Sequence, residues 1–193
     1  MNYLAHLYLT RNYHEEVSIG NFIADAVKGQ KAIANYPDKI QRGIRIHREI
    51  DSFTDTHPLV KNGTKRLHSN YGKFAGIIVD IFYDHILATN WDQFSEDTLD
   101  DFAQSQYKLI TTHWNHLPAR TQFWYYYMYQ NNLLVTYAQE DVIELVLQRM
   151  DKRMGSISGM GGAIEELRIY KNEYTKEFRA FFLEIQEHIS SSY

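Results

Sequence analysis

The stretch IIVDIFYDHIL, residues 77–87, indicates both the class of fold and the position of a polar site. It lies within a helix that we predict over about residues 73–91, and its residues other than Asp80, Asp84 and His85 are nearly all apolar. A helix that is apolar on all sides is typical of a protein interior. The two aspartates lie four residues apart and therefore share one face of that helix. The segment thus predicts a helical core that contains paired carboxylates.

Helical periodicity also dominates on either side of this segment. Hairpin signals, such as Asn-Gly between alternating runs, are missing. We expect a loop over Gly155–Gly162 and an all-α, single-domain multi-helix bundle over residues 1–193. The expected helices cover about residues 2–10, 18–27 with Ser18 as N-cap, 37–53, 58–71, 73–91, a segment after Ser95 with Glu96 and Asp97 in its first turn, segments from near Pro118 and near Glu140, and 163–189.

Composition excludes several classes of protein. The chain has 193 residues, which is enough for one domain with a full core. It has no cysteine, which excludes a disulfide scaffold, a cysteine-ligated zinc site and a cysteine nucleophile. Its net charge of −4 disfavours a nucleic-acid partner. A signal peptide and a membrane-spanning run are both missing, so we expect a cytoplasmic protein with no membrane partner.

Four predicted helices in the first 90 residues each carry two polar residues that share one face. Buried carboxylates cost several kcal/mol unless they are paired, hydrogen-bonded or bound to metal. A divalent cation would hold several of them together, and an oxygen and imidazole donor set favours Mn²⁺, Mg²⁺ or Fe²⁺. The pairs are Asn2 and His6, Asn21 and Asp25, His47 and Asp51, and Asp80 and Asp84, with His85 directly after the last.

Several of these residues also have a purely structural interpretation, whereas Asp80, Asp84 and His85 are harder to explain in this way because their surroundings are almost all apolar. His6 would then be a hydrogen-bonded core histidine, and Asp25 would cap a loop amide. The stripe of His47, Asp51 and Asp55 would be a salt-bridged helix face that pairs with Arg48. Spacing alone leaves these alternatives open.

Four blocks of sequence resemble the acyl carrier protein phosphodiesterase family in order and spacing. They are MNYLAHLYL at 1–9, GNFIAD at 20–25, GIRIHREIDSFTDTHP at 43–58 and DIFYDHILATNW at 80–91. The resemblance implies an all-helical, Mn²⁺-dependent enzyme that is distantly HD-phosphohydrolase-like. It also implies hydrolysis of the phosphodiester between 4′-phosphopantetheine and a serine of holo-acyl carrier protein, which gives apo-carrier protein and 4′-phosphopantetheine.

The matched blocks contain the polar residues described above, and we predict a role for each. Such a reaction needs an activated water, charge neutralisation on the phosphate and help for the leaving serine oxygen. We expect Asp51 to orient a metal-bound histidine, His85 to donate a proton to the leaving group and Arg48 to bind a phosphate oxygen. The expected metal ligands are His6, Asp25, His47, Asp80 and Asp84.

A flexible arm on an acidic helical protein implies a narrow cleft with a basic rim. The candidates for that rim are Lys61, Lys65 and Arg66, or Arg149, Lys152 and Arg153, and the alternative for either cluster is a solvated surface. The run FWYYYMY at 123–129 either flanks the arm or is simply buried. Two other functions stay open: an HD-type phosphohydrolase acting on a nucleotide or another phosphodiester, and a non-catalytic helical binding module.

Overall fold

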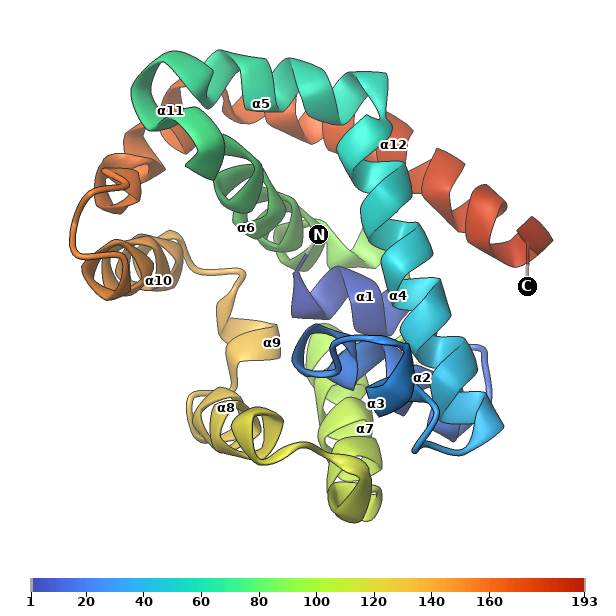
Figure 1. Ribbon diagram of the computed structural model, residues 1–193. Coiled ribbons are helices and arrows are strands. Elements are labelled where there is room, and N and C mark those ends of the chain that lie inside the picture. The colour runs from blue at the N-terminus through green and yellow to red at the C-terminus, as the bar shows by residue number, and fades with distance from the viewer. Residues whose placement is uncertain (1, 193) are drawn as a thin grey trace.

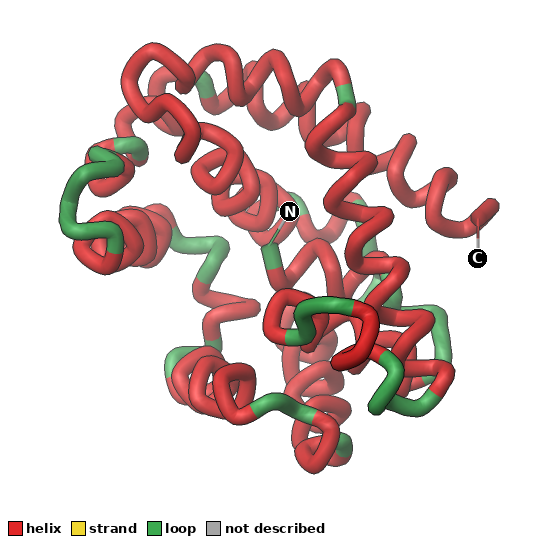
Figure 2. Tube along the Cα trace, in the orientation of Figure 1, coloured by secondary structure: helices red, strands yellow, loops and turns green. Residues whose placement is uncertain are grey.

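The computed structural model describes residues 2–192, which form helices and no strand (Figures 1 and 2). The predicted all-α class is therefore confirmed. No helix in residues 2–192 is long and apolar enough to cross a membrane. The α-helices are α1 (Tyr3–Leu9), α2 (Glu15–Ile23), α3 (Gln30–Ile33), α4 (Asp38–Thr56), α5 (Pro58–Tyr71), α6 (Ala75–Thr89), α7 (Leu99–Thr112), α8 (Ala119–Gln130), α9 (Leu133–Thr136), α10 (Glu140–Arg153), α11 (Ile164–Ile169) and α12 (Lys171–Ser192). The 3₁₀ turns are η1 (Ala24–Ala26), η2 (Gly72–Phe74), η3 (Trp91–Gln93), η4 (Trp114–His116) and η5 (Met160–Gly162).

Helix α6 lies in the core, as its apolar sequence predicts. It contacts α1, α5, α10 and α12, and nearly all of its residues after the first turn are buried. Phe82 and Tyr83 of α6 meet Tyr174 and Phe178 of α12 with ring centroids 5.2 and 5.1 Å apart. Figure 1 shows α4, α5 and α6 as consecutive helices with sharp corners between them, with α1 close to the end of α6. This corner arrangement positions the site described below.

Two glycines allow α2 and α4 to pack backbone against backbone. A Cβ atom on Gly20 would lie 2.0 Å from the Ile40 carbonyl oxygen, and one on Gly43 would lie 2.0 Å from the Val17 carbonyl oxygen. Any side chain would therefore push the two helices apart. Asn21 follows Gly20 directly, so this close approach brings it into reach of α4.

The start of α2 differs from the prediction. The helix begins at Glu15, and the His14 side chain accepts a hydrogen bond from the Glu16 N–H at its N-terminus. Ser18 is not the N-cap, because its hydroxyl is buried and donates to the Thr10 carbonyl. A hydroxyl that pairs with a neighbouring segment and one that caps a helix look alike in sequence.

Helix α7, which the sequence predicts to start directly after Ser95, begins later than expected. The Thr98 hydroxyl accepts from the Asp101 N–H, so α7 starts at Leu99. Glu96 and Asp97 therefore precede the helix instead of lying in its first turn, where the structure has Asp100 and Asp101.

The C-terminal segment forms two helices instead of the single helix expected over 163–189. Tyr170 leaves the helical conformation, with φ −109° and ψ 25°. Helix α11 packs against α10, whereas α12 packs against α5 and α6, so the chain must change direction between them. The expected loop over 155–162 contains η5 and is fastened by Asp151, whose carboxylate accepts from the Ser158 hydroxyl and the Gly159 N–H.

We expect Gly43→Ala to destabilise the protein by about 3 kcal/mol, because overpacking against backbone atoms cannot be relieved by side-chain movement. Urea or thermal denaturation measures this, and a loss of that size lowers the Tm by roughly 6–12 °C. Gly76→Ala is the control, since nothing lies within 4 Å of the added methyl group. The control should match or slightly exceed wild-type stability; equal stability of both variants would contradict the close-packing argument.

Candidate metal centre

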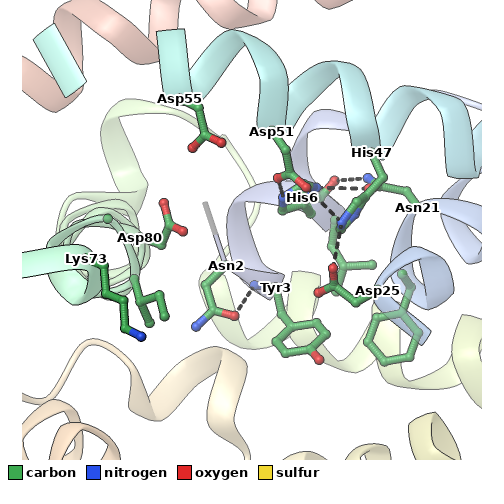
Figure 3. A pocket seen from close by; sticks show the side chains of 14 residues that line it. Asn2, Tyr3, His6, Asn21, Asp25, His47, Asp51, Asp55, Lys73 and Asp80 are labelled. Atoms are coloured by element: carbon green, nitrogen blue, oxygen red, sulfur yellow. Dashed lines mark hydrogen bonds and ion pairs between the residues drawn. The ribbon is translucent and has the colours of Figure 1, made fainter. Parts of the chain in front are cut away.

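A polar pocket of about 360 Å³ lies between α1, α4 and α6. Most of the predicted site residues point into it from different helices (Figure 3). Its lining consists of Asn2, Tyr3, His6, Leu7, Asn21, Phe22, Asp25, His47, Asp51, Asp55, Lys73, Gly76, Ile77 and Asp80.

Two stacked histidines form the floor of this pocket. The rings of His6 from α1 and His47 from α4 lie 4.2 Å apart, and the Nδ1 atom of each is 3.0 Å from the Asn21 side-chain oxygen. The Asn21 amide nitrogen donates to the His6 carbonyl at 2.7 Å and to the Thr10 hydroxyl at 3.1 Å, which fixes the amide orientation. Because Asn21 Oδ1 only accepts, both Nδ1 atoms carry a hydrogen. Each neutral ring therefore presents an unprotonated Nε2.

Asp51 meets both of these Nε2 atoms. Its two carboxylate oxygens lie 3.2 Å from His6 Nε2 and 3.2 Å from His47 Nε2. His6 Nε2 is buried and makes no hydrogen bond within residues 2–192. His6, His47 and Asp51 each offer a ligand atom, and these atoms all lie within 4.8 Å of one another. They form a candidate metal-binding triad in which a cation would satisfy the unpaired nitrogen.

Charge in the triad depends on His47. Burial opposes its protonation, but hydrogen bonds to Asp25 and Asp51 outweigh this effect and raise the pKa of His47 to about 9. Burial and the neighbouring His47 lower the pKa of His6. Asp51 is partly buried, yet its histidine partners hold its pKa below the ordinary value. Besides the two Nδ1 hydrogens, the site without a cation therefore carries one further ring proton near neutral pH, on His47 Nε2, where a cation would replace it.

The rest of the pocket is acidic. Asp25 Oδ1 lies 3.4 Å from His47 Nε2, and Asp55 and Asp80 line the opposite part of the pocket. Burial raises the pKa of Asp55, and the nearby Asp80 and Asp51 raise it further by repulsion. Lys73 from η2 is the single lysine among these lining residues, and it contributes positive charge to the pocket. A group of carboxylates of this kind attracts cations and repels an anionic substrate unless a cation is bound.

Asp84, which we predicted as a metal ligand, lies outside this pocket lining. It is buried, and its carboxylate accepts from the backbone N–H groups of Asn2 at 3.2 Å, Leu4 at 2.8 Å and Ala5 at 3.2 Å. Burial raises the pKa of Asp84 to about 7, although these three donors oppose the shift. The structure thus places Asp84 at the N-terminus of α1, where it holds the helix that presents His6.

His85 and Arg48 also lie apart from the lining of the pocket. His85 is buried, and its Nδ1 bonds to the Tyr137 carbonyl at 2.8 Å. Arg48 is exposed and donates to the Val27 carbonyl at 3.4 Å. The structure therefore brings together five predicted residues, namely His6, Asp25, His47, Asp51 and Asp80, and leaves three outside.

Asn21 has a role that the sequence argument did not give it. We expected Asp51 to orient a metal-bound histidine, but the structure places Asn21 at both Nδ1 atoms and Asp51 on the Nε2 side. The signal was an asparagine in an apolar segment, one helical turn before Asp25. Such a residue needs buried partners, and here they are two imidazoles.

Comparison with known proteins gives one consistent result. The family model described as Acyl carrier protein phosphodiesterase matches residues 1–185. The chain belongs to this family. It is 34% identical over 183 residues to the acyl carrier protein phosphodiesterase of Yersinia pestis, which covers 94% of each chain. It is 31% identical to that of Photorhabdus laumondii, covering 94% of this chain and 91% of the relative. It is 29% identical to that of Escherichia coli O45:K1, covering 98% of both.

Membership of the acyl carrier protein phosphodiesterase family confirms the resemblance seen in the sequence. It also confirms that the chain is an enzyme of the hydrolase class. No solved structure matches the chain. The expected likeness to the HD fold therefore stays a prediction.

We expect Asn21→Leu to weaken divalent-cation binding by about 10–100-fold, because both imidazoles lose the partner that fixes their tautomer. Titration calorimetry measures the affinity, and nitrogen NMR of the imidazoles reports the tautomers directly. Asn21→Asp keeps an oxygen acceptor for both Nδ1 atoms but loses the donor to the His6 carbonyl, so it should keep the tautomers while lowering stability. The interpretation is wrong if the leucine variant stays folded and binds the cation as the wild type does.

Proposed function

We propose that this protein is a divalent-metal-dependent phosphodiesterase that releases 4′-phosphopantetheine from holo-acyl carrier protein. The observation that carries the proposal is the convergence of His6 Nε2, His47 Nε2 and the Asp51 carboxylate in an acidic pocket. Family membership supports the reaction class and the carrier protein as substrate.

In this proposal His6, His47 and Asp51 hold the cation, and Asp25 lies beside them as a further oxygen donor. The mixed imidazole and carboxylate donor set fits Mn²⁺, with Mg²⁺ and Fe²⁺ as alternatives. When bound, such an ion lowers the pKa of a water molecule and neutralises charge on the phosphate. Asp80 of α6 lines the same pocket and adds a further carboxylate to it.

The remaining lining residues hold the substrate. We assign to Lys73, which lines the pocket, the pairing with a phosphate oxygen that the sequence predicts for Arg48. Water adds to phosphorus, the bond from phosphorus to the serine oxygen breaks, and that oxygen takes up a proton. Asp84 serves as a positioning residue through α1, and the buried His85 has no part in this proposal.

The test measures the release of phosphopantetheine from purified holo-acyl carrier protein. Mass spectrometry detects it as a loss of mass from the carrier protein. Chelation should abolish the reaction, and a panel of Mn²⁺, Mg²⁺, Fe²⁺ and Zn²⁺ should identify the ion that restores it.

Asp51→Ala should lower kcat/KM by about 10³-fold, since it removes a carboxylate that holds the cation. Ser52→Ala, on the exposed side of the same helix, should behave as the wild type. Full turnover by Asp51→Ala would contradict the site, whereas turnover of nucleotides without carrier turnover would favour the HD-type alternative.

Cation binding should depend on pH through His47. Because its pKa is raised to about 9, the cation must displace one proton from it at neutral pH. The pKa values of His6, Asp25 and Asp51 are all lowered, so these groups are already deprotonated and add no further dependence. The apparent Kd for Mn²⁺ should therefore fall about tenfold per pH unit between pH 6.5 and 8.5. Calorimetry in two buffers of different ionisation enthalpy should show close to one proton released, and a flat profile would refute this protonation state.

A further inference from the structure

Helix α5 differs in charge from the rest of this acidic chain. Over Pro58–Tyr71 it carries Lys61, Lys65, Arg66 and His68 but no aspartate or glutamate. The whole chain has a net charge of −4, so this helix is a local excess of positive charge. It follows α4 directly, and α4 carries His47 and Asp51 of the metal centre.

A second groove runs between α5 and α6 and opens onto the metal pocket. Its volume is about 560 Å³, and it shares Asp55, Gly76 and Asp80 with the pocket. The α5 residues that line this groove recur every three or four positions, so one face of the helix forms its wall. A ligand that extends from the metal pocket past Asp55 and Asp80 would therefore continue along α5.

The two lysines of this wall are available to a partner. Lys61 and Lys65 are exposed, and within residues 2–192 neither makes an ion pair. Arg66 is excluded, because its guanidinium makes two bonds to the Glu177 carboxylate and lies over the Tyr174 ring. Of the three basic side chains that the sequence analysis groups together, Lys61 and Lys65 are therefore free to bind a partner, whereas Arg66 is held within the protein.

The other basic cluster is less well placed. Arg149, Lys152 and Arg153 lie at the end of α10 and line neither the metal pocket nor the α5 groove. Arg149 lies over the Tyr127 ring instead. This cluster is therefore a suitable comparison rather than a second candidate.

We propose that Lys61 and Lys65 bind acidic residues of the carrier protein that flank its phosphopantetheinyl serine; this inference rests on the proposed function. The metal pocket is acidic and by itself repels an anionic phosphodiester and any acidic side chains beside it, so attraction has to come from the adjoining surface. The two lysines are four residues apart, about 6 Å along the helix axis, which matches carboxylates one turn apart on a partner helix. The α5 groove is thus the docking surface of the carrier.

The experiment compares Lys61→Glu/Lys65→Glu with Lys152→Glu/Arg153→Glu, which makes the same change in net charge at the other cluster. For the α5 variant we expect the KM for holo-carrier protein and the Kd for apo-carrier protein to rise at least about tenfold, because two attractive contacts become repulsive. The control variant should keep wild-type values. Wild-type binding should weaken steeply with salt, and the α5 variant should lose most of that dependence.

The outcomes separate the two proposals. If the wild type releases phosphopantetheine and the α5 variant matches it in KM and Kd, the docking surface is wrong and the proposed function stands. An equal loss in the control variant would also overturn the docking surface, since net charge alone would then explain the effect. If the wild type releases none, the proposed function fails, and the docking inference fails with it. Circular dichroism and the Tm confirm that both variants are folded.

Discussion

The site depends on one buried amide that serves two imidazoles. Asn21 Oδ1 accepts from the Nδ1 atoms of His6 and His47, while its amide group is held by the His6 carbonyl and Thr10. This arrangement turns both Nε2 atoms the same way, toward Asp51. It requires α2 to lie against α4 at backbone distance, which Gly20 and Gly43 permit. Two residues without side chains are therefore required for the geometry of the candidate triad.

Two aspartates on α6 illustrate how one sequence pattern carries two functions. Asp80 lines the acidic pocket, whereas Asp84, one turn later, is enclosed by three backbone N–H groups of the α1 start. The unpaired N–H groups at a helix start favour a negative charge, so the buried carboxylate and the helix satisfy each other. Because His6 directly follows Ala5 in α1, this pairing also fixes where one residue of the candidate triad lies.

The helical class and most helices could be predicted because apolar periodicity is a local property of the chain. The bounds of α5 follow from Pro58 and were predicted correctly. Periodicity also identified His6, Asp25, His47 and Asp51 as residues that must meet partners. It did not show the partner of each residue, since spacing gives the face of a helix and not what packs against it. For that reason the sequence analysis predicts Asp84 as a metal ligand and Asp51 as the orienting residue, whereas the structure has Asp84 at the start of α1 and Asn21 at both Nδ1 atoms.

Two neighbouring surfaces of the protein carry opposite charge, and each suits a different part of the proposed reaction. The pocket concentrates carboxylates, which suits a cation and opposes an anionic substrate. In the proposed function the enzyme must also attract an anionic phosphodiester, so it needs positive charge close to these carboxylates but outside the candidate triad. Lys73 at the pocket and the lysines of α5 along the adjoining groove satisfy both conditions. The short turn η2 connects α5 to α6, so the basic helix and the helix that carries Asp80 are neighbours along the chain and line the same groove.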